Sequence, residues 1–151
     1  MASFRLMTRV VVTALALVAF TASPGAQTSP YRARLSPVPI DIPMQSAIAG
    51  SGSATATLKG TTLTITGTFG GLKTAATVAR VHRGPRTAMR GPAIGDLTIT
   101  AATSGTIAGS IELTKAQIDD LAAGRLYIQL HSQKAPDGNL WGWLLAADPK
   151  K

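Results

Sequence analysis

The sequence contains no cysteine and few aromatic residues. Without cysteine the chain has no disulfide bond, no thiolate nucleophile and no thiolate metal ligand. Phenylalanine, tyrosine and tryptophan make up 5% of the 151 residues, and histidine occurs only twice. This scarcity argues against nucleic acid as a partner, because binding of single strands relies on stacking of bases on aromatic rings.

Acidic residues are also scarce, and none lies between Asp41 and Asp96. The chain has 15 lysines and arginines against 7 acids, a formal charge of +8. Asp119 and Asp120 are adjacent and therefore diverge on a helix, and Glu112 is isolated in the sequence. No serine lies in a nucleophile-elbow motif. Nothing in the sequence combines an acid, a base and a nucleophile, so we expect the protein not to be an enzyme.

Long hydrophobic runs are absent after the first residues of the chain. Residues 10–20 form an apolar run that follows Arg5 and Arg9 and precedes small residues, which is the layout of a secretory signal peptide. Eleven residues are too few to cross a bilayer core, which needs about 20. We expect cleavage near Ala26 and a soluble product, in the periplasm or secreted, with no stable membrane span. An uncleaved anchor is the alternative.

The remaining chain has room for one domain. We interpret residues 27–52 as a Pro-, Ser- and Gly-rich N-terminal arm that contains the first strand, and residues 53–147 as the body. In the body, residues 62–69 alternate apolar side chains with threonines, the pattern of a strand with one buried face. Turn residues separate further short strands, and the final hairpin, residues 125–146, has its predicted turn at residues 136–139.

One short helix is predicted between the strands. Thr114 and Gln117 have the spacing of a capping box, and Gly124 follows at the place of a C-terminal cap. Seven or eight short strands with a single helix favour an all-β fold, an antiparallel Greek-key β-sandwich.

Both tryptophans lie on the last strand. Trp141 and Trp143 are two residues apart and share one face, with Leu140 and Leu144 on the other. We favour a core position for the tryptophans, because large aromatic side chains are mostly buried. The alternative is an exposed pair that, with Tyr127 from the neighbouring strand, contacts a sugar ring or a protein partner.

Several short motifs together resemble a known family, the CHRD domain, which is named for repeats in chordin and also occurs as single exported bacterial domains. The motifs are GTFGGL (67–72), VH (81–82), LAAGRLY (121–127), LHS (130–132) and PDGN (136–139). The resemblance covers roughly residues 31–146. It implies a β-sandwich similar to Cu,Zn superoxide dismutase, and a binding or structural role instead of a defined enzymatic activity.

The chain departs from the family pattern at two places. The family commonly ends its third strand with His-x-His, whereas Arg80 takes the place of the first histidine and only His82 remains. The family's last strand is usually polar, whereas residues 139–145 read NLWGWLL and are mostly apolar.

The two histidines, His82 and His131, each end a predicted strand. If the strands bring them together, their imidazoles are able to bind copper or zinc with Asp96 or Asp137 as a third ligand. The alternative is that both histidines are structural hydrogen-bonding groups. Arg80 on the same face favours this alternative, because a permanent cation repels a divalent metal ion.

The densest group of positive charge lies around His82 and consists of Arg80, Arg83, Arg86 and Arg90. Guanidinium groups pair with carboxylates and phosphates in bidentate geometry. We therefore predict a loop that binds an acidic protein or an anionic envelope component, with nucleic acid disfavoured. A solvated loop without a partner is the alternative. Besides this binding role and metal binding, a purely structural role in the envelope stays open.

Overall fold

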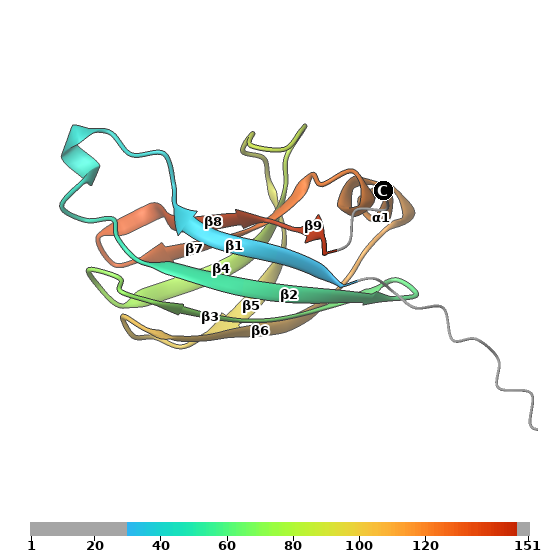
Figure 1. The fold of residues 1–151 in the computed structure, drawn as a ribbon, viewed down its shortest axis with the longest axis horizontal. Coiled ribbons are helices and arrows are strands. Elements are labelled where there is room, and N and C mark those ends of the chain that lie inside the picture. The colour runs from blue at the N-terminus through green and yellow to red at the C-terminus, as the bar shows by residue number, and fades with distance from the viewer. Residues whose placement is uncertain (1–29, 148–151) are drawn as a thin grey trace, which may run out of the picture.

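The computed structural model describes residues 30–147, and the predicted signal peptide, residues 1–26, lies outside the described residues. Within them the chain is almost entirely β-structure (Figure 1). The strands are β1 (Tyr31–Pro37), β2 (Ser51–Lys59), β3 (Thr62–Gly70), β4 (Ala76–Arg83), β5 (Ala93–Ile99), β6 (Gly105–Glu112), β7 (Leu126–Ser132), β8 (Ala135–Trp143) and β9 (Leu145–Ala146). The helices are the 3-10 helix η1 (Ile42–Met44) and α1 (Lys115–Ala122). No helix among the described residues is long and apolar enough to span a membrane.

The strands close into an antiparallel barrel of eight strands, in the order β2-β3-β6-β5-β4-β7-β8-β1, with β1 paired again to β2. Strand β1 closes the barrel because it changes partner along its length: residues 31–35 pair with β2, whereas Ser36 and Pro37 pair with β8. Strand β5 joins β4 to β6 in the same way. The fold is therefore a closed barrel and not the predicted sandwich of two sheets, because closure leaves no open sheet edge among these eight strands.

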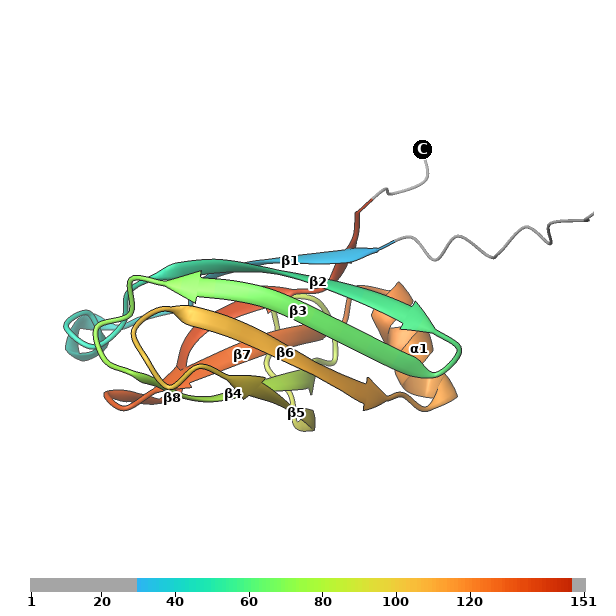
Figure 2. The same cartoon turned by 90° about the horizontal axis from the view of Figure 1, so that it is seen from below.

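The order of the strands gives the Greek-key connections expected from the sequence. Strands β4, β5 and β6 are consecutive neighbours, and β7 returns to lie beside β4. Figure 2 shows the result: β3 and β6 lie over β7 and β4, and α1 covers one end of the barrel.

The core lies between the walls of the barrel and is aliphatic. In β3, Leu63, Ile65 and Phe69 point inward and are at most 5% exposed, while the threonines point outward, as predicted. Strand β7 contributes Leu126, Ile128 and Leu130, all fully buried. Burial of each such side chain stabilises the fold by about 1.5–3 kcal/mol.

Helix α1 confirms the predicted caps. The hydroxyl of Thr114 accepts a hydrogen bond from the backbone N–H of Gln117, and the Gln117 side chain accepts one from the backbone N–H of Thr114. Gly124 follows the helix with a φ of 68°, a left-handed conformation that glycine adopts without strain.

The turn of the final hairpin was predicted at residues 136–139, and this prediction is wrong. It lies at Gln133 and Lys134, because Ser132 pairs with Ala135. Since Leu130 pairs with Leu140, residues 136–139 form a wide bulge in β8 opposite a single residue of β7. The bulge frees the carbonyl groups of residues 136 and 137 for side chains of β7.

Candidate functional site

Five ring-bearing side chains from three strands meet on the outer face of the barrel. Strand β7 lies between β4 and β8, and the register places His82, Tyr127 and Trp143 side by side on these strands. Tyr127 stacks on His82 with ring centroids 5.0 Å apart and lies 4.4 Å from Trp143. We define the aromatic cluster as His82, Tyr127, His131, Trp141 and Trp143. Its members were predicted as site residues, and the structure brings them together.

The two tryptophans face outward, so the core position favoured from the sequence is wrong. The inward positions of β8 belong to Leu140 and Gly142, and both tryptophans are half-buried. Their rings lie 5.9 Å apart in an edge-to-face arrangement. The tryptophans and the loop that follows β4 cover Tyr127, which is only 1% exposed although it points outward.

The loop at residues 84–92, which follows β4, is fastened to the cluster through Gly91. The Tyr127 hydroxyl accepts a hydrogen bond from the Gly91 N–H at 3.0 Å and donates one to the Gly91 carbonyl at 3.2 Å. The same carbonyl lies 2.9 Å from Nδ1 of His82. A Cβ atom at Gly91 would lie 1.8 Å from the carbonyl oxygen of Arg83, so only glycine fits this approach. The rings of the cluster thus position the loop.

Two of the four predicted arginines are ion-paired. Nε of Arg80 lies 2.8 Å from Oδ1 of Asp96 on β5. Arg83 pairs with Asp120 of α1, which also pairs with Arg125 at 3.1 Å. Asp120 is only 3% exposed, and a buried carboxylate requires such partners. These pairs leave Arg80 and Arg83 less free to bind an external anion.

The other two arginines extend from the exposed loop. Nε of Arg86 lies 2.8 Å from Sδ of Met89. The guanidinium carbon of Arg90 lies 5.7 Å from the ring centroid of Trp141, within the range of a cation–π interaction. One nitrogen of Arg90 also donates to the carbonyl of Asp137, at 3.3 Å. Of the predicted arginines, Arg90 is the one that contacts the tryptophan pair.

Both histidines are oriented by backbone carbonyl groups. Nδ1 of His82 bonds to the Gly91 carbonyl, and Nδ1 of His131 lies 2.7 Å from the carbonyl of Pro136 in the bulge. Because a carbonyl only accepts, each Nδ1 carries a proton, and in the neutral ring Nε2 is then the atom with the lone pair. Nε2 of His82 is buried without a hydrogen-bond partner among residues 30–147. The histidine rings lie 6.5 Å apart.

The predicted third metal ligands do not join the histidines. Asp96 pairs with Arg80, and Asp137 contacts Arg90 through its backbone carbonyl. Within the described part of the chain, no group of three His, Cys, Asp or Glu side chains has the arrangement of a metal site. Each imidazole is held through Nδ1 by a carbonyl group, as the imidazoles of metal-binding histidines often are. The described residues supply no third His, Cys, Asp or Glu ligand beside them.

Two participating residues were missed in the sequence. Gln129 lies between Tyr127 and His131 on the outer face and donates from Nε2 to the Asp137 carbonyl at 3.0 Å, while its Oε1 is buried without a partner in the described region. Strand alternation alone would have identified Gln129. Nothing in the sequence identified Asp120, because its burial depends on how α1 packs against the arginines.

Burial lowers the pKa of His82; the Gly91 carbonyl opposes this shift, and His131, Arg80 and Arg90 add to it. The unfolded chain, with a histidine pKa near 6.5, then binds the proton more readily than the folded one. The stability that His82 contributes is therefore complete above about pH 6.5 and is lost as the pH falls through the folded pKa.

We predict that wild-type protein loses more free energy of unfolding between about pH 7.5 and pH 5 than a His82→Asn variant. Asparagine keeps a donor for the Gly91 carbonyl but does not titrate in this range. Urea unfolding at the two pH values measures the difference. Equal losses in the two proteins would contradict the assignment.

Comparison with known proteins agrees with the motifs in the sequence. The family model of the CHRD domain matches residues 31–144, which extends from β1 through β8. No curated protein matches the chain, and no solved structure matches it. The family match covers most of the chain and all eight strands of the barrel, so the chain belongs to the CHRD domain family.

Proposed function

We propose that this CHRD-domain barrel is an exported, non-enzymatic binding protein, periplasmic or secreted, that binds an acidic protein or an anionic envelope component. The binding surface is the outer face formed by the aromatic cluster and Arg90. The observation that carries the proposal is the position of Arg90, an exposed guanidinium held over the half-exposed ring of Trp141. The likeness of the fold to Cu,Zn superoxide dismutase stays a prediction.

The chemistry of this surface suits a partner that carries carboxylates. Arginine and tryptophan are the side chains that most often dominate protein interfaces, because they combine a large contact area with directional polar groups. Contacts with Trp141 and with the Asp137 carbonyl pre-orient the Arg90 guanidinium, which lowers the entropy cost of pairing it with an anion. No carboxylate among residues 30–147 forms an ion pair with Arg90.

The surroundings of the cluster support a binding role over catalysis. The carboxylates of Asp96 and Asp120 are each paired with arginine. The cluster contributes two indoles, two oriented imidazoles and the phenol of Tyr127, whose hydroxyl is bonded to the backbone of Gly91, and it contains no serine, threonine or cysteine nucleophile.

We predict that an Arg90→Gln variant and a Trp141→Leu variant each bind immobilised poly-L-glutamate about threefold or more weakly than wild type, because each loses one half of the cation–π pair. Elution at increasing salt measures retention. The matched control is Lys73→Gln, which removes one exposed charge away from the cluster.

Equal losses for Arg90→Gln and Lys73→Gln would show that net charge alone is responsible and would refute the binding surface. Full retention by the Trp141→Leu variant would refute the contribution of the cluster. If wild-type protein does not bind the acidic polymer at all, a purely structural role in the envelope is the better description.

The second candidate function is metal binding by His82 and His131. The observation that favours it is that both Nδ1 atoms are held by carbonyl groups, so that Nε2 is the atom of each ring left to bind a metal ion such as copper or zinc. Nε2 of His82 has no partner among residues 30–147, whereas Nε2 of His131 lies 3.5 Å from Nε2 of Gln129, a contact that a metal ion would replace. Arg80 and Arg90 oppose a divalent ion, since their charges already disfavour protonation of His82.

Metal analysis of protein purified without a histidine tag tests this candidate. If it holds, about one copper or zinc ion per chain is present after dialysis against the metal, and a His131→Ala variant loses it while its circular dichroism spectrum is unchanged. A wild-type protein that retains no metal after dialysis dismisses it.

A further inference from the structure

A second outer face of the barrel carries hydroxyl groups in place of rings. It lies over β1, β2 and β3, and apart from Lys59 at the end of β2 its exposed side chains on β2 and β3 are serines and threonines. The hydroxyl-bearing residues are Ser51, Ser53, Thr55, Thr64, Thr66 and Thr68. The alternating pattern of β3 predicts this face. None of its residues belongs to the aromatic cluster, which lies on β4, β7 and β8.

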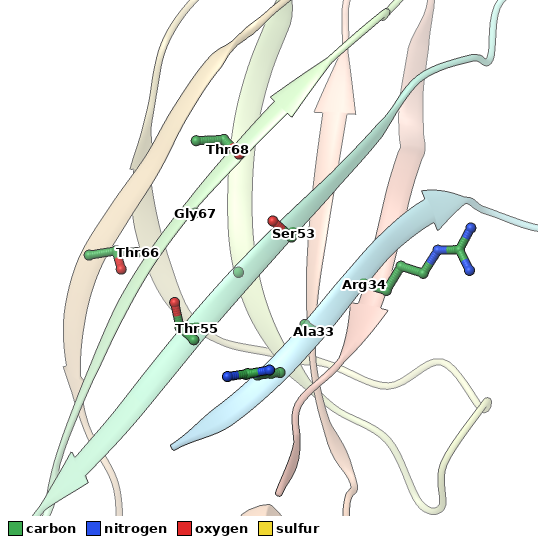
Figure 3. Close-up of a pocket in the computed structure, with 9 residues that line it drawn as sticks. Ala33, Arg34, Ser53, Thr55, Thr66, Gly67 and Thr68 are labelled. Atoms are coloured by element: carbon green, nitrogen blue, oxygen red, sulfur yellow. The ribbon is translucent and has the colours of Figure 1, made fainter. Parts of the chain in front are cut away.

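A shallow groove of about 700 Å³ crosses the strands on this face. Its lining residues come from all three strands (Figure 3): Arg32, Ala33, Arg34, Ser53, Ala54, Thr55, Thr66, Gly67 and Thr68. The register arranges the outward side chains in two rows, one from Arg32 through Thr55 to Thr66 and one from Arg34 to Thr68. The rows lie about 6.7 Å apart, the spacing of alternate residues in a strand.

The floor between the rows is formed by backbone. Ala33 and Ala54 point into the barrel and are 3% and 5% exposed, and Gly67 pairs with Ala54 in the register. No large side chain therefore rises between the two rows, and an extended molecule can lie across the three strands.

Positive charge lies at the β1 edge of the groove. Arg32 and Arg34 are both exposed, and neither forms an ion pair with any residue from 30 to 147. Figure 3 shows the Arg34 side chain extending from β1 away from Ser53 and Thr68, so its guanidinium continues the cationic edge beyond the hydroxyl rows. Glu112, on the neighbouring β6, already accepts hydrogen bonds from Thr61 and Thr62.

We propose that this groove binds an acidic polysaccharide, a chain of sugars that carries carboxylate or sulfate groups. Serine and threonine hydroxyls both donate and accept hydrogen bonds, as sugar hydroxyls do, and guanidinium groups pair with carboxylate or sulfate. The lining has no aromatic or large apolar side chain, which disfavours a protein interface with buried anchors. The same absence disfavours single-stranded nucleic acid, which needs rings for stacking.

The proposal is tested by measuring binding of the whole protein to polygalacturonate, a carboxylated polysaccharide. Dextran, which carries no charge, is the control polymer. We expect an Arg32→Gln, Arg34→Gln double variant to bind about tenfold more weakly than wild type. A Thr55→Val, Thr66→Val double variant keeps β-branched side chains on the strands but loses two hydroxyls, and we expect it to bind about fivefold more weakly. Affinity electrophoresis measures both.

The control is a Lys73→Gln, Lys134→Gln double variant, which removes the same charge outside the groove and should stay within about twofold of wild type. An equal loss in this control, unchanged binding by the threonine variant, equal binding of dextran or no binding of polygalacturonate would each overturn the proposal. Arg90→Gln should bind polygalacturonate normally, and the two arginine changes on β1 should not alter retention on poly-L-glutamate. If either of these variants lost binding to both polymers, the two polymers would share a single site, and the proposal of a separate groove would be overturned.

Discussion

Burial of strand β7 on both of its faces is the constraint on which the site depends. Apart from His131, every residue of β7 is buried. Its leucines and isoleucine fill the core, while Tyr127 is covered from outside by the tryptophans and the loop at residues 84–92, and Gln129 contacts the bulge of β8. A strand in the middle of a closed barrel with both faces packed has little freedom, so the outward side chains beside it are held in fixed positions.

The arrangement of charge follows from the same packing. Asp120 is buried at the end of α1 and takes Arg83 and Arg125 as partners, and Arg80 pairs with Asp96. Arg90 contacts a ring and a carbonyl instead. The four arginines that look alike in the sequence therefore differ in the structure: Arg80 and Arg83 are ion-paired, Arg86 contacts Met89, and Arg90 is pre-oriented toward solvent.

Local features were predictable from the sequence, and long-range features were not. Alternation in β3 and the capping box of Thr114 depend on neighbouring residues, and both were predicted correctly. The meeting of His82 with His131 was only a conditional expectation, because it depends on the pairing of β4 with β7, which the sequence did not give. Barrel closure was not predictable, because the change of partner by β1 depends on strands more than a hundred residues apart. The outward position of the tryptophans was only the alternative in the sequence analysis, because the contacts with Tyr127 that favour this position depend on the pairing of β7 with β8.

The most direct test of this account is amide hydrogen exchange at Gly91. The Tyr127 hydroxyl fastens the loop and so places Arg90 over Trp141. In a Tyr127→Phe variant the Gly91 amide should exchange about tenfold faster or more than in wild type. The Gly84 amide, bonded to the Arg125 carbonyl, should keep its rate. An unchanged rate at Gly91 would show that the loop is held by other contacts and would contradict the account.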